Sequence, residues 1–213
     1  AKGSRLAHIV MHAELEGILC SGARRGKQFT YALLEERAPH AKQLERDEAL
    51  AELVKRYFSS HGPATIQDFV WWSGLTVADA KIGLENAKSH LMQETIEGRT
   101  YWFSTNANSS TSSTSTFHLL PWFDEFLVAY RDRSAVLESA NAKQVNAGGG
   151  MLNPTIVSRG QVVGTWKNVL KKDKVILNVT LFRSLEEKEK HSLAVALNHY
   201  GKFLNKPVLL DPE

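Results

Sequence analysis

The chain has little cysteine, no long apolar run and almost no net charge, and each shortage narrows what the protein can be. Cys20 is the only cysteine among 213 residues, so an internal disulfide and a zinc site built on cysteine pairs are both excluded. No apolar stretch approaches the roughly 18–20 residues that cross a bilayer, and residues 1–10 lack the apolar core of a signal peptide. We therefore expect a soluble intracellular protein without membrane contact, bound metal or cofactor.

The balance of charges excludes a strongly cationic DNA coat. Lysines and arginines number 26 against 23 acids, which gives a formal net charge of +3. Any nucleic-acid site must therefore be a local patch. The 43% hydrophobic content is enough for one large or two small domains. Apolar residues at helical spacing are already present over residues 5–15 and no initiator methionine precedes them, so we expect a fragment of a longer protein.

Two Thr-x-x-Asp sequences predict a pair of capped helices. Thr65 precedes Asp68 by three residues and Thr76 precedes Asp79 by three, with Gly74 between the two pairs. In each pair the threonine hydroxyl can cap a helix while the aspartate places negative charge in the first turn. Two helices joined by a tight glycine turn are typical of a helix-turn-helix, which makes nucleic-acid binding the first function to consider.

The surrounding pattern extends this pair to a complete winged helix over residues 45–104. A third helix is predicted upstream, and two strands around a Glu-Gly-Arg turn are predicted downstream. In chain order the predicted elements are helices 47–60, 65–72 and 76–89 and strands 91–96 and 100–103.

Residues 1–36 are predicted to be the C-terminal part of another winged-helix unit. A helix over residues 5–15 is followed by strands at 17–21 and 29–34, and a basic turn connects the strands. This is the order in which a winged helix ends.

The remaining chain is predicted to be a flexible loop and a β-rich domain. Residues 105–116 are rich in serine and threonine and bury too little apolar surface to offset their ordering entropy. Within residues 117–213, the stretches 155–157, 162–166 and 175–182 alternate like the strands of a small antiparallel sheet. A helix over about 185–204, capped by Ser184 with Glu187, and a strand at 208–210 complete the domain. The fold class is therefore α+β, with tandem winged helices followed by a β-rich part.

Several short motifs, taken together in this order and spacing, resemble one bacterial protein family. They are Arg56-Tyr57-Phe58, His61-Gly62-Pro63-Ala64, Asp68-Phe69, Trp72-Ser73-Gly74-Leu75, Leu119-Leu120-Pro121, Phe123-Asp124, Tyr130-Arg131-Asp132-Arg133 and Gly164-Thr165-Trp166. The family is that of bacterial tandem winged-helix proteins whose characterised members are DNA glycosylases that remove bulky alkylated bases and unhook interstrand crosslinks. The resemblance runs from about residue 6 to the C-terminal strand and implies tandem winged helices and association with DNA.

The catalytic signature of that family is not found in this chain. It is a glutamine-hydrophobic-glutamine motif, or a variant with Asp or His in place of one Gln, in an earlier region than this chain covers. The glutamines here never stand two positions from another Gln, Asp or His in that arrangement. No catalytic residue is therefore carried over, and the resemblance implies that the N-terminal part is missing.

The basic turn of the first wing is the foremost candidate for a DNA contact. Arg24, Arg25 and Lys27 stand beside Gly22 and Gly26, so their cations can approach phosphates closely. The alternative is a solvated turn. Arg99, at the tip of the second wing, is open to the same two interpretations.

The third helix of the complete winged helix is a poor candidate for reading bases. With Val77, Ala80, Leu84, Ala87 and Leu91 facing the core, the opposite face presents Ala78, Ile82, Glu85 and Ser89. Lys81 and Lys88 lie near the core edge and are further candidates for DNA contact. The helix can instead pack on a neighbouring domain or line a groove.

Three further clusters have both a functional and a structural interpretation. The strip Lys167, Lys171, Lys172 and Lys174 can extend a phosphate track or can be a solvated hairpin. Asp124 is a weak candidate for a carboxylate that activates water, but an ion pair of the Phe123-Asp124 segment with Arg131 or Arg133 is the favoured interpretation. His8, His12 and Glu16 share a helix face, yet they lack a fourth ligand nearby, which argues against a metal site.

These observations favour a DNA-binding module of a repair glycosylase that contacts double-stranded DNA mostly through phosphates. We expect a monomer located with the nucleoid in the cytoplasm. An active monofunctional DNA glycosylase is one alternative. A winged-helix protein-interaction module without DNA binding is another.

Overall fold

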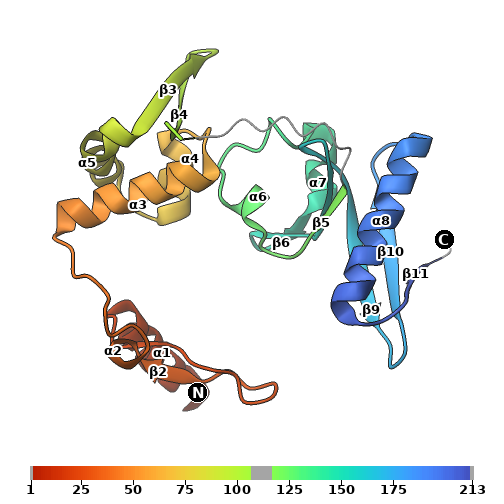
Figure 1. Ribbon diagram of the computed structural model, residues 1–213, viewed down its shortest axis with the longest axis horizontal. Coiled ribbons are helices and arrows are strands. Elements are labelled where there is room, and N and C mark those ends of the chain that lie inside the picture. The colour runs from red at the N-terminus through yellow and green to blue at the C-terminus, as the bar shows by residue number, and fades with distance from the viewer. Residues whose placement is uncertain (1, 107–116, 212–213) are drawn as a thin grey trace. The chain divides into compact units, whose positions relative to one another are not determined.

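The computed structural model describes residues 2–106 and 117–211 and divides the chain into two units, residues 1–46 and 47–213 (Figure 1). Most of the loop predicted at 105–116 thus lies outside the described residues. No helix within the described ranges combines the length and the apolar character that a bilayer span requires.

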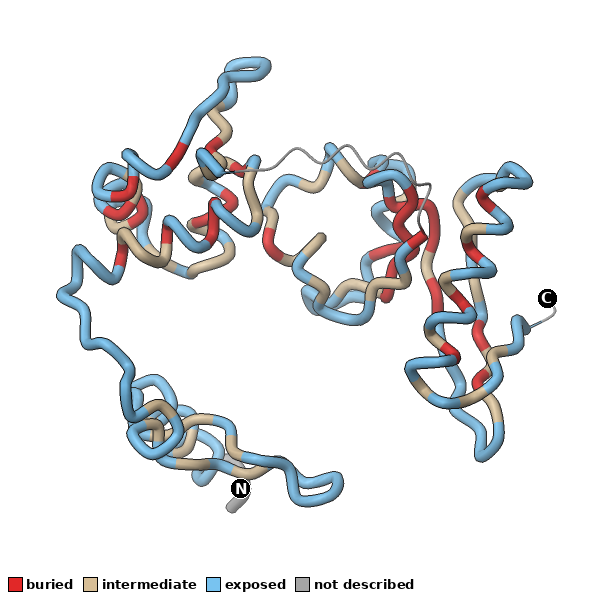
Figure 2. The backbone as a smooth tube through the Cα atoms, viewed as in Figure 1, coloured by how far each residue is buried: buried red, intermediate tan, exposed pale blue. Residues whose placement is uncertain are grey.

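The first unit consists of two helices and a hairpin, and none of its described side chains is buried. Its elements are α1 (Lys2–Leu15), β1 (Leu19–Ser21), β2 (Tyr31–Leu33) and α2 (Leu34–Arg37). Helix α1 ends because Gly17 adopts a left-handed conformation and the N–H of Ile18 bonds the carbonyl of Ala13 at 2.9 Å. From residue 5 to residue 46 no side chain is buried (Figure 2). This unit is therefore organised by backbone hydrogen bonds and turn geometry.

The second unit begins with three helices and a hairpin in the predicted order. They are α3 (Arg46–His61), α4 (Ile66–Ser73), α5 (Val77–Ala87), the short 3-10 helix η1 (Lys88–His90), β3 (Leu91–Ile96) and β4 (Arg99–Ser104). Both predicted threonine caps are present: the Thr65 hydroxyl accepts the N–H of Asp68 at 3.2 Å, and the Thr76 hydroxyl accepts that of Asp79 at 3.1 Å. Ala64 exchanges two backbone hydrogen bonds with Trp102, which ties the helices to the hairpin.

Helix α5 packs on α3 through most of the predicted face, since Ala80 and Ala87 are buried and Leu84 packs against the core. Val77, also expected in the core, is 51% exposed. Gly83 is buried as well and lies close to α3, where a Cβ atom would lie 2.7 Å from the carbonyl oxygen of Leu50. The face predicted to be presented, which carries Ile82, is exposed as expected.

A five-stranded sheet and a long helix form the C-terminal part. The strand order is β11-β10-β9-β8-β5, and α8 packs on one face of this sheet (Figure 1). The elements are β5 (Phe117–Leu120), α6 (Glu125–Val128), η2 (Ser139–Asn141), α7 (Ala142–Val145), β6 (Asn146–Gly148), β7 (Met151–Leu152), β8 (Thr155–Ser158), β9 (Gln161–Leu170), β10 (Val175–Leu181), α8 (Glu187–Leu204) and β11 (Val208–Leu210).

Two details of this part correct the sequence-based expectations. The sheet is not wholly antiparallel, because β11 pairs with β10 in parallel; α8 crosses over between them and returns the chain to the same end of the sheet. Helix α8 begins at Glu187 and is capped by Glu186 rather than by Ser184. The carboxylate of Glu189 accepts the N–H of Glu186 at 3.1 Å and two bonds from Arg183, which fixes the helix start.

Candidate functional site

A cavity of about 880 Å³ opens in the second unit between the helices, the β3–β4 hairpin and the segment after α6. Four short stretches of chain line it. They are residues 61–63 at the end of α3, 65–68 at the start of α4, 98–102 around the hairpin turn, and several residues between Phe126 and Val136. Its walls are therefore built from residues up to 75 positions apart in sequence.

Asp68 is the buried charge in the wall of the cavity. The residue is 4% exposed. One oxygen, Oδ2, accepts the N–H and the hydroxyl of Thr65 at 2.9 and 2.7 Å. The other, Oδ1, accepts the N–H groups of Arg131 and Asp132 at 2.9 and 3.3 Å. All of these bonds compensate the loss of hydration, so the carboxylate serves to fix the segment after α6 against α4.

Arg99, predicted as a phosphate contact on the second wing, forms an ion pair with Asp132. Hydrogen bonds from Ser134, and then the pair with Arg99, lower the pKa of Asp132 to about 2. The carboxylate is thus ionised at neutral pH and offsets the charge of the guanidinium. This pairing weakens the attraction of the Arg99 guanidinium for a phosphate.

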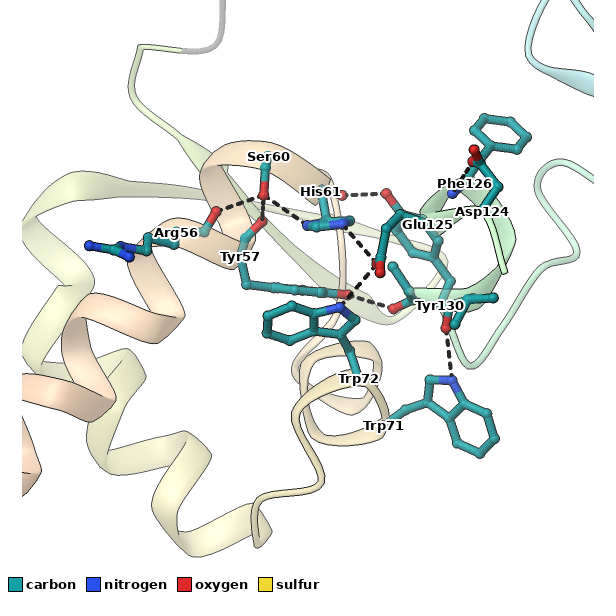
Figure 3. A network of polar contacts seen from close by, with 12 residues as sticks. Arg56, Tyr57, Ser60, His61, Trp71, Trp72, Asp124, Glu125, Phe126 and Tyr130 are labelled. Atoms are coloured by element: carbon teal, nitrogen blue, oxygen red, sulfur yellow. Dashed lines mark hydrogen bonds and ion pairs between the residues drawn. The ribbon is translucent and has the colours of Figure 1, made fainter. Parts of the chain in front are cut away.

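A histidine and a glutamate meet beside the cavity (Figure 3). The Nε2 atom of His61 lies 3.3 Å from Oε2 of Glu125, and the indole N–H of Trp72 donates to the same oxygen at 3.0 Å. Ser60 Oγ lies 2.8 Å from the other ring nitrogen of His61. The Tyr57 ring stacks on the imidazole at 4.9 Å between centroids. The imidazole is therefore held on both nitrogens and on one face.

Two tyrosines complete this network as hydrogen-bond donors. The Tyr57 hydroxyl donates to the carbonyl of Ala129 at 3.0 Å, and the Tyr130 hydroxyl donates to that of His61 at 2.7 Å. Burial, and secondarily the charge of Asp68, raises the pKa of both phenols above the usual range. Both therefore stay protonated at neutral pH and cannot act as bases.

Trp71, the neighbour of Trp72, is 55% exposed and donates to the carbonyl of Val128 at 3.1 Å (Figure 3).

Asp124, the predicted carboxylate candidate, is the N-cap of α6. Its Oδ1 accepts the N–H of Phe126 at 3.0 Å. The predicted ion pair with Arg131 or Arg133 is not among the ion pairs of the described residues; the Nε of Arg133 donates instead to the carbonyl of Leu127 at 2.6 Å. Glu125, one position further on, is the carboxylate that joins the His61 network. Sequence reasoning missed this pair, since no local pattern links positions 61 and 125.

The basic turn of the first unit projects its cations into solvent. Arg24, Arg25 and Lys27 are all exposed. Arg25 and Gln28 exchange two backbone hydrogen bonds around a two-residue turn, in which Gly26 has the positive φ that such turns require. The Arg24 guanidinium lies 4.6 Å from the centre of the Phe29 ring. The tip is thus a tight hairpin with cationic side chains.

The other predicted cations lie at separate places in the second unit. Lys81 is exposed on α5, and Lys88 pairs with Glu85 at 3.2 Å. Lys167 is exposed on β9. Lys171, Lys172 and Lys174 form the turn that follows this strand. Among the residues that the structure describes, no group of His, Cys, Asp and Glu side chains could hold a metal ion, including the cluster around His12.

Known proteins match this chain over most of its length. The family of DNA glycosylase AlkZ-like proteins matches residues 1–203. The interstrand DNA cross-link repair glycosylase of Streptomyces sahachiroi is 30% identical over 163 residues, which cover 72% of this chain and 44% of the relative. The solved structure of the Streptomyces sahachiroi DNA glycosylase AlkZ has a similar fold, with a TM-score of 0.73 at 24% identity over 92% of this chain and 55% of that one. The chain spans about half the length of these relatives, and it belongs to the DNA glycosylase AlkZ-like family.

Proposed function

We propose that this chain is the DNA-binding part of a bacterial repair glycosylase that acts on alkylated or crosslinked bases. The observation that carries the proposal is the exposed cationic turn of Arg24, Arg25 and Lys27 in a member of a DNA glycosylase family. The crosslink-repair name of the similar protein supports the class of lesion. Such a protein would act in the cytoplasm, where bacterial DNA lies.

The proposal includes tandem winged helices. The helix α1 with its hairpin forms the end of one, and helices α3, α4 and α5 with the β3–β4 hairpin form the other. In this arrangement the two hairpins are wings. The wing with Arg24 contacts phosphates, whereas Arg99 on the other wing is largely neutralised by Asp132.

Binding is proposed to be nearly independent of base sequence. The exposed face of α5 carries Ile82 and Glu85, and Lys88 is paired with Glu85. An isoleucine and a mutually paired glutamate and lysine offer few free donors and acceptors for base edges in the major groove. Phosphate neutralisation with release of counterions is then the main source of affinity.

The test is binding of the full chain to fluorescent duplexes of unrelated sequence at several salt concentrations. Arg24→Ala with Arg25→Ala should weaken binding to every duplex and should reduce the salt slope by about 2, one unit for each lost phosphate contact. Lys188→Ala with Lys190→Ala, two cations at the start of α8, is the matched control and should leave binding unchanged. Equal affinity of the wing variant and the wild type would contradict the assignment of the wing.

An active glycosylase is the second candidate, favoured by the family match. Release of 7-methylguanine or 3-methyladenine from methylated DNA by the chain alone would establish it. If the wild type shifts no duplex even at low salt, a protein-interaction module becomes the better proposal.

A further inference from the structure

The turn between β9 and β10 concentrates positive charge in a short loop closed by a backbone hydrogen bond. Four lysines and one aspartate occur between residues 167 and 174. The loop itself, Lys171-Lys172-Asp173-Lys174, is closed by a bond from the N–H of Lys171 to the carbonyl of Lys174 at 2.9 Å. Lys171 and Lys172 are exposed. We refer to Lys167, Lys171, Lys172 and Lys174 as the lysine strip.

A further lysine, Lys206, binds the backbone of this loop from the connection between α8 and β11. Its ammonium donates to the carbonyls of Lys171 at 2.6 Å and Lys172 at 3.1 Å. The connection is itself anchored, because the N–H of Lys206 bonds the carbonyl of Gly201 at 3.0 Å. Gly201 permits this approach, since a Cβ atom there would lie 2.8 Å from the carbonyl oxygen of Lys206.

This arrangement adds the ammonium of Lys206 to a stretch of chain in which lysines outnumber carboxylates. The Lys206 ammonium is brought to a loop that already carries three lysines, and Asp173 is the one carboxylate within the strip. Repulsion among like charges opposes such clustering in the free protein. A polyanion relieves that repulsion when it binds, and a loop whose backbone is already fixed loses less conformational entropy on binding.

We propose that the lysine strip is a second phosphate-binding element for duplex DNA, and that Lys206 is its positioning residue. The proposal rests on the proposed function for the identity of the polyanion. In it, the side chains of Lys171 and Lys172 neutralise phosphates. Lys206 acts through the loop, because its ammonium donates to the two loop carbonyls.

The first test measures affinity of the full chain for one duplex across a range of salt concentrations. Lys171→Ala with Lys172→Ala should weaken binding several-fold and lower the salt slope by about 2. The same loss should occur in a protein that already carries Arg24→Ala and Arg25→Ala, since the two elements act separately. Lys188→Ala with Lys190→Ala again serves as the control.

The second test separates positioning by Lys206 from a general loss of folding. Lys206→Met keeps the aliphatic stem and removes the ammonium. It should weaken DNA binding in the wild type but not in the Lys171→Ala, Lys172→Ala background, and Lys206→Arg should restore part of the affinity. Equal weakening in both backgrounds would overturn the positioning role.

The outcomes distinguish failure of the lysine strip as a DNA contact from failure of the proposed function. If the wild type binds DNA and the Lys171→Ala, Lys172→Ala variant binds it equally well, the strip is not a DNA contact while the proposed function stands. If the wild type binds no duplex, both proposals fail. If the variant loses binding only to vesicles that contain phosphatidylserine, a membrane surface is the ligand and the DNA assignment is overturned.

Discussion

The carboxylate of Asp68 accepts the backbone N–H of Arg131, 63 positions further along the chain, at 2.9 Å. Together with its bonds to Thr65 it joins the start of α4 to the segment after α6. That segment supplies one wall of the cavity. A residue first recognised as a local helix cap therefore also holds together two distant parts of the chain.

Replacement of Asp68 should cost more stability than an ordinary helix cap. Asp68→Ala leaves the partly buried N–H groups of Thr65 and Arg131 without their acceptor, and we expect the free energy of unfolding to fall by about 2–4 kcal/mol. Asp68→Asn keeps one acceptor oxygen and should lose less. Urea denaturation measures both. Asp79→Ala, at the equivalent position of the other Thr-x-x-Asp pair, is the comparison, and an equal loss there would show that the contact with Arg131 contributes nothing.

Gly83→Ala should destabilise the contact between α3 and α5. The added methyl group would lie 2.7 Å from the Leu50 carbonyl oxygen and 2.8 Å from a methyl carbon of Val54. We expect a loss of about 1–3 kcal/mol, typical of overpacking, although alanine has the higher helix propensity. Thermal unfolding of this variant is compared with that of Asn86→Ala, an exposed position of the same helix. A rise in melting temperature for Gly83→Ala would refute the close packing.

Stability should decline in acid partly through Glu189. Bidentate hydrogen bonds from Arg183 lower the pKa of Glu189 from 4.5 to about 2. Because the folded pKa lies below the unfolded one, the stabilisation is fully present above about pH 4.5 and is lost as the pH falls towards 2. The free energy of unfolding, measured between pH 7 and pH 2, should therefore depend less on pH in Glu189→Gln than in the wild type. Glu187 is an exposed residue of the same helix that pairs with Lys190. Glu187→Gln should leave the pH dependence of stability unchanged.

Glu125 is expected to stabilise the network around His61. Glu125→Ala removes the acceptor of the Trp72 indole and the partner of the imidazole, and we expect a loss of about 1–2 kcal/mol because the glutamate is partly exposed. Glu125→Gln keeps an acceptor oxygen and should lose less. Chemical denaturation measures the stability of both variants, and Glu94→Ala on the exposed hairpin is the control. If the chain releases methylated purines, unchanged release by Glu125→Gln would assign this residue a structural role only.

Local chemistry made many elements predictable. The helix around Tyr57 follows from apolar residues at helical spacing, and the two threonine caps define the next two helices within one or two residues. The β3–β4 turn needs positive φ at Glu97 and Gly98, which a Glu-Gly-Arg sequence permits. Caps, turn residues and apolar spacing each involve residues close together in the chain, so the sequence alone predicts them.

Contacts between distant segments were not predictable in this way. Periodicity places Val77 in the core together with Ala80 and Ala87, yet Val77 is 51% exposed in the structure. The sequence singles out Asp124 and gives no reason to consider Glu125, because its role depends on the position of His61. The pairing of Arg99 with Asp132 likewise depends on how the hairpin lies beside the segment after α6.

By itself the sequence determined the helices α1, α3, α4, α5 and α8, the hairpins β1–β2 and β3–β4 and their order, together with the family resemblance and the stretches rich in lysine and arginine. Capping, turn formation and periodic burial depend on neighbouring residues, so the chain carries this information locally. Only the tertiary structure decided which charges are already paired and which carboxylate meets His61. It also showed that the ammonium of Lys206 donates to the carbonyls of Lys171 and Lys172. These outcomes depend on distances across the fold, which a linear order of residues does not contain.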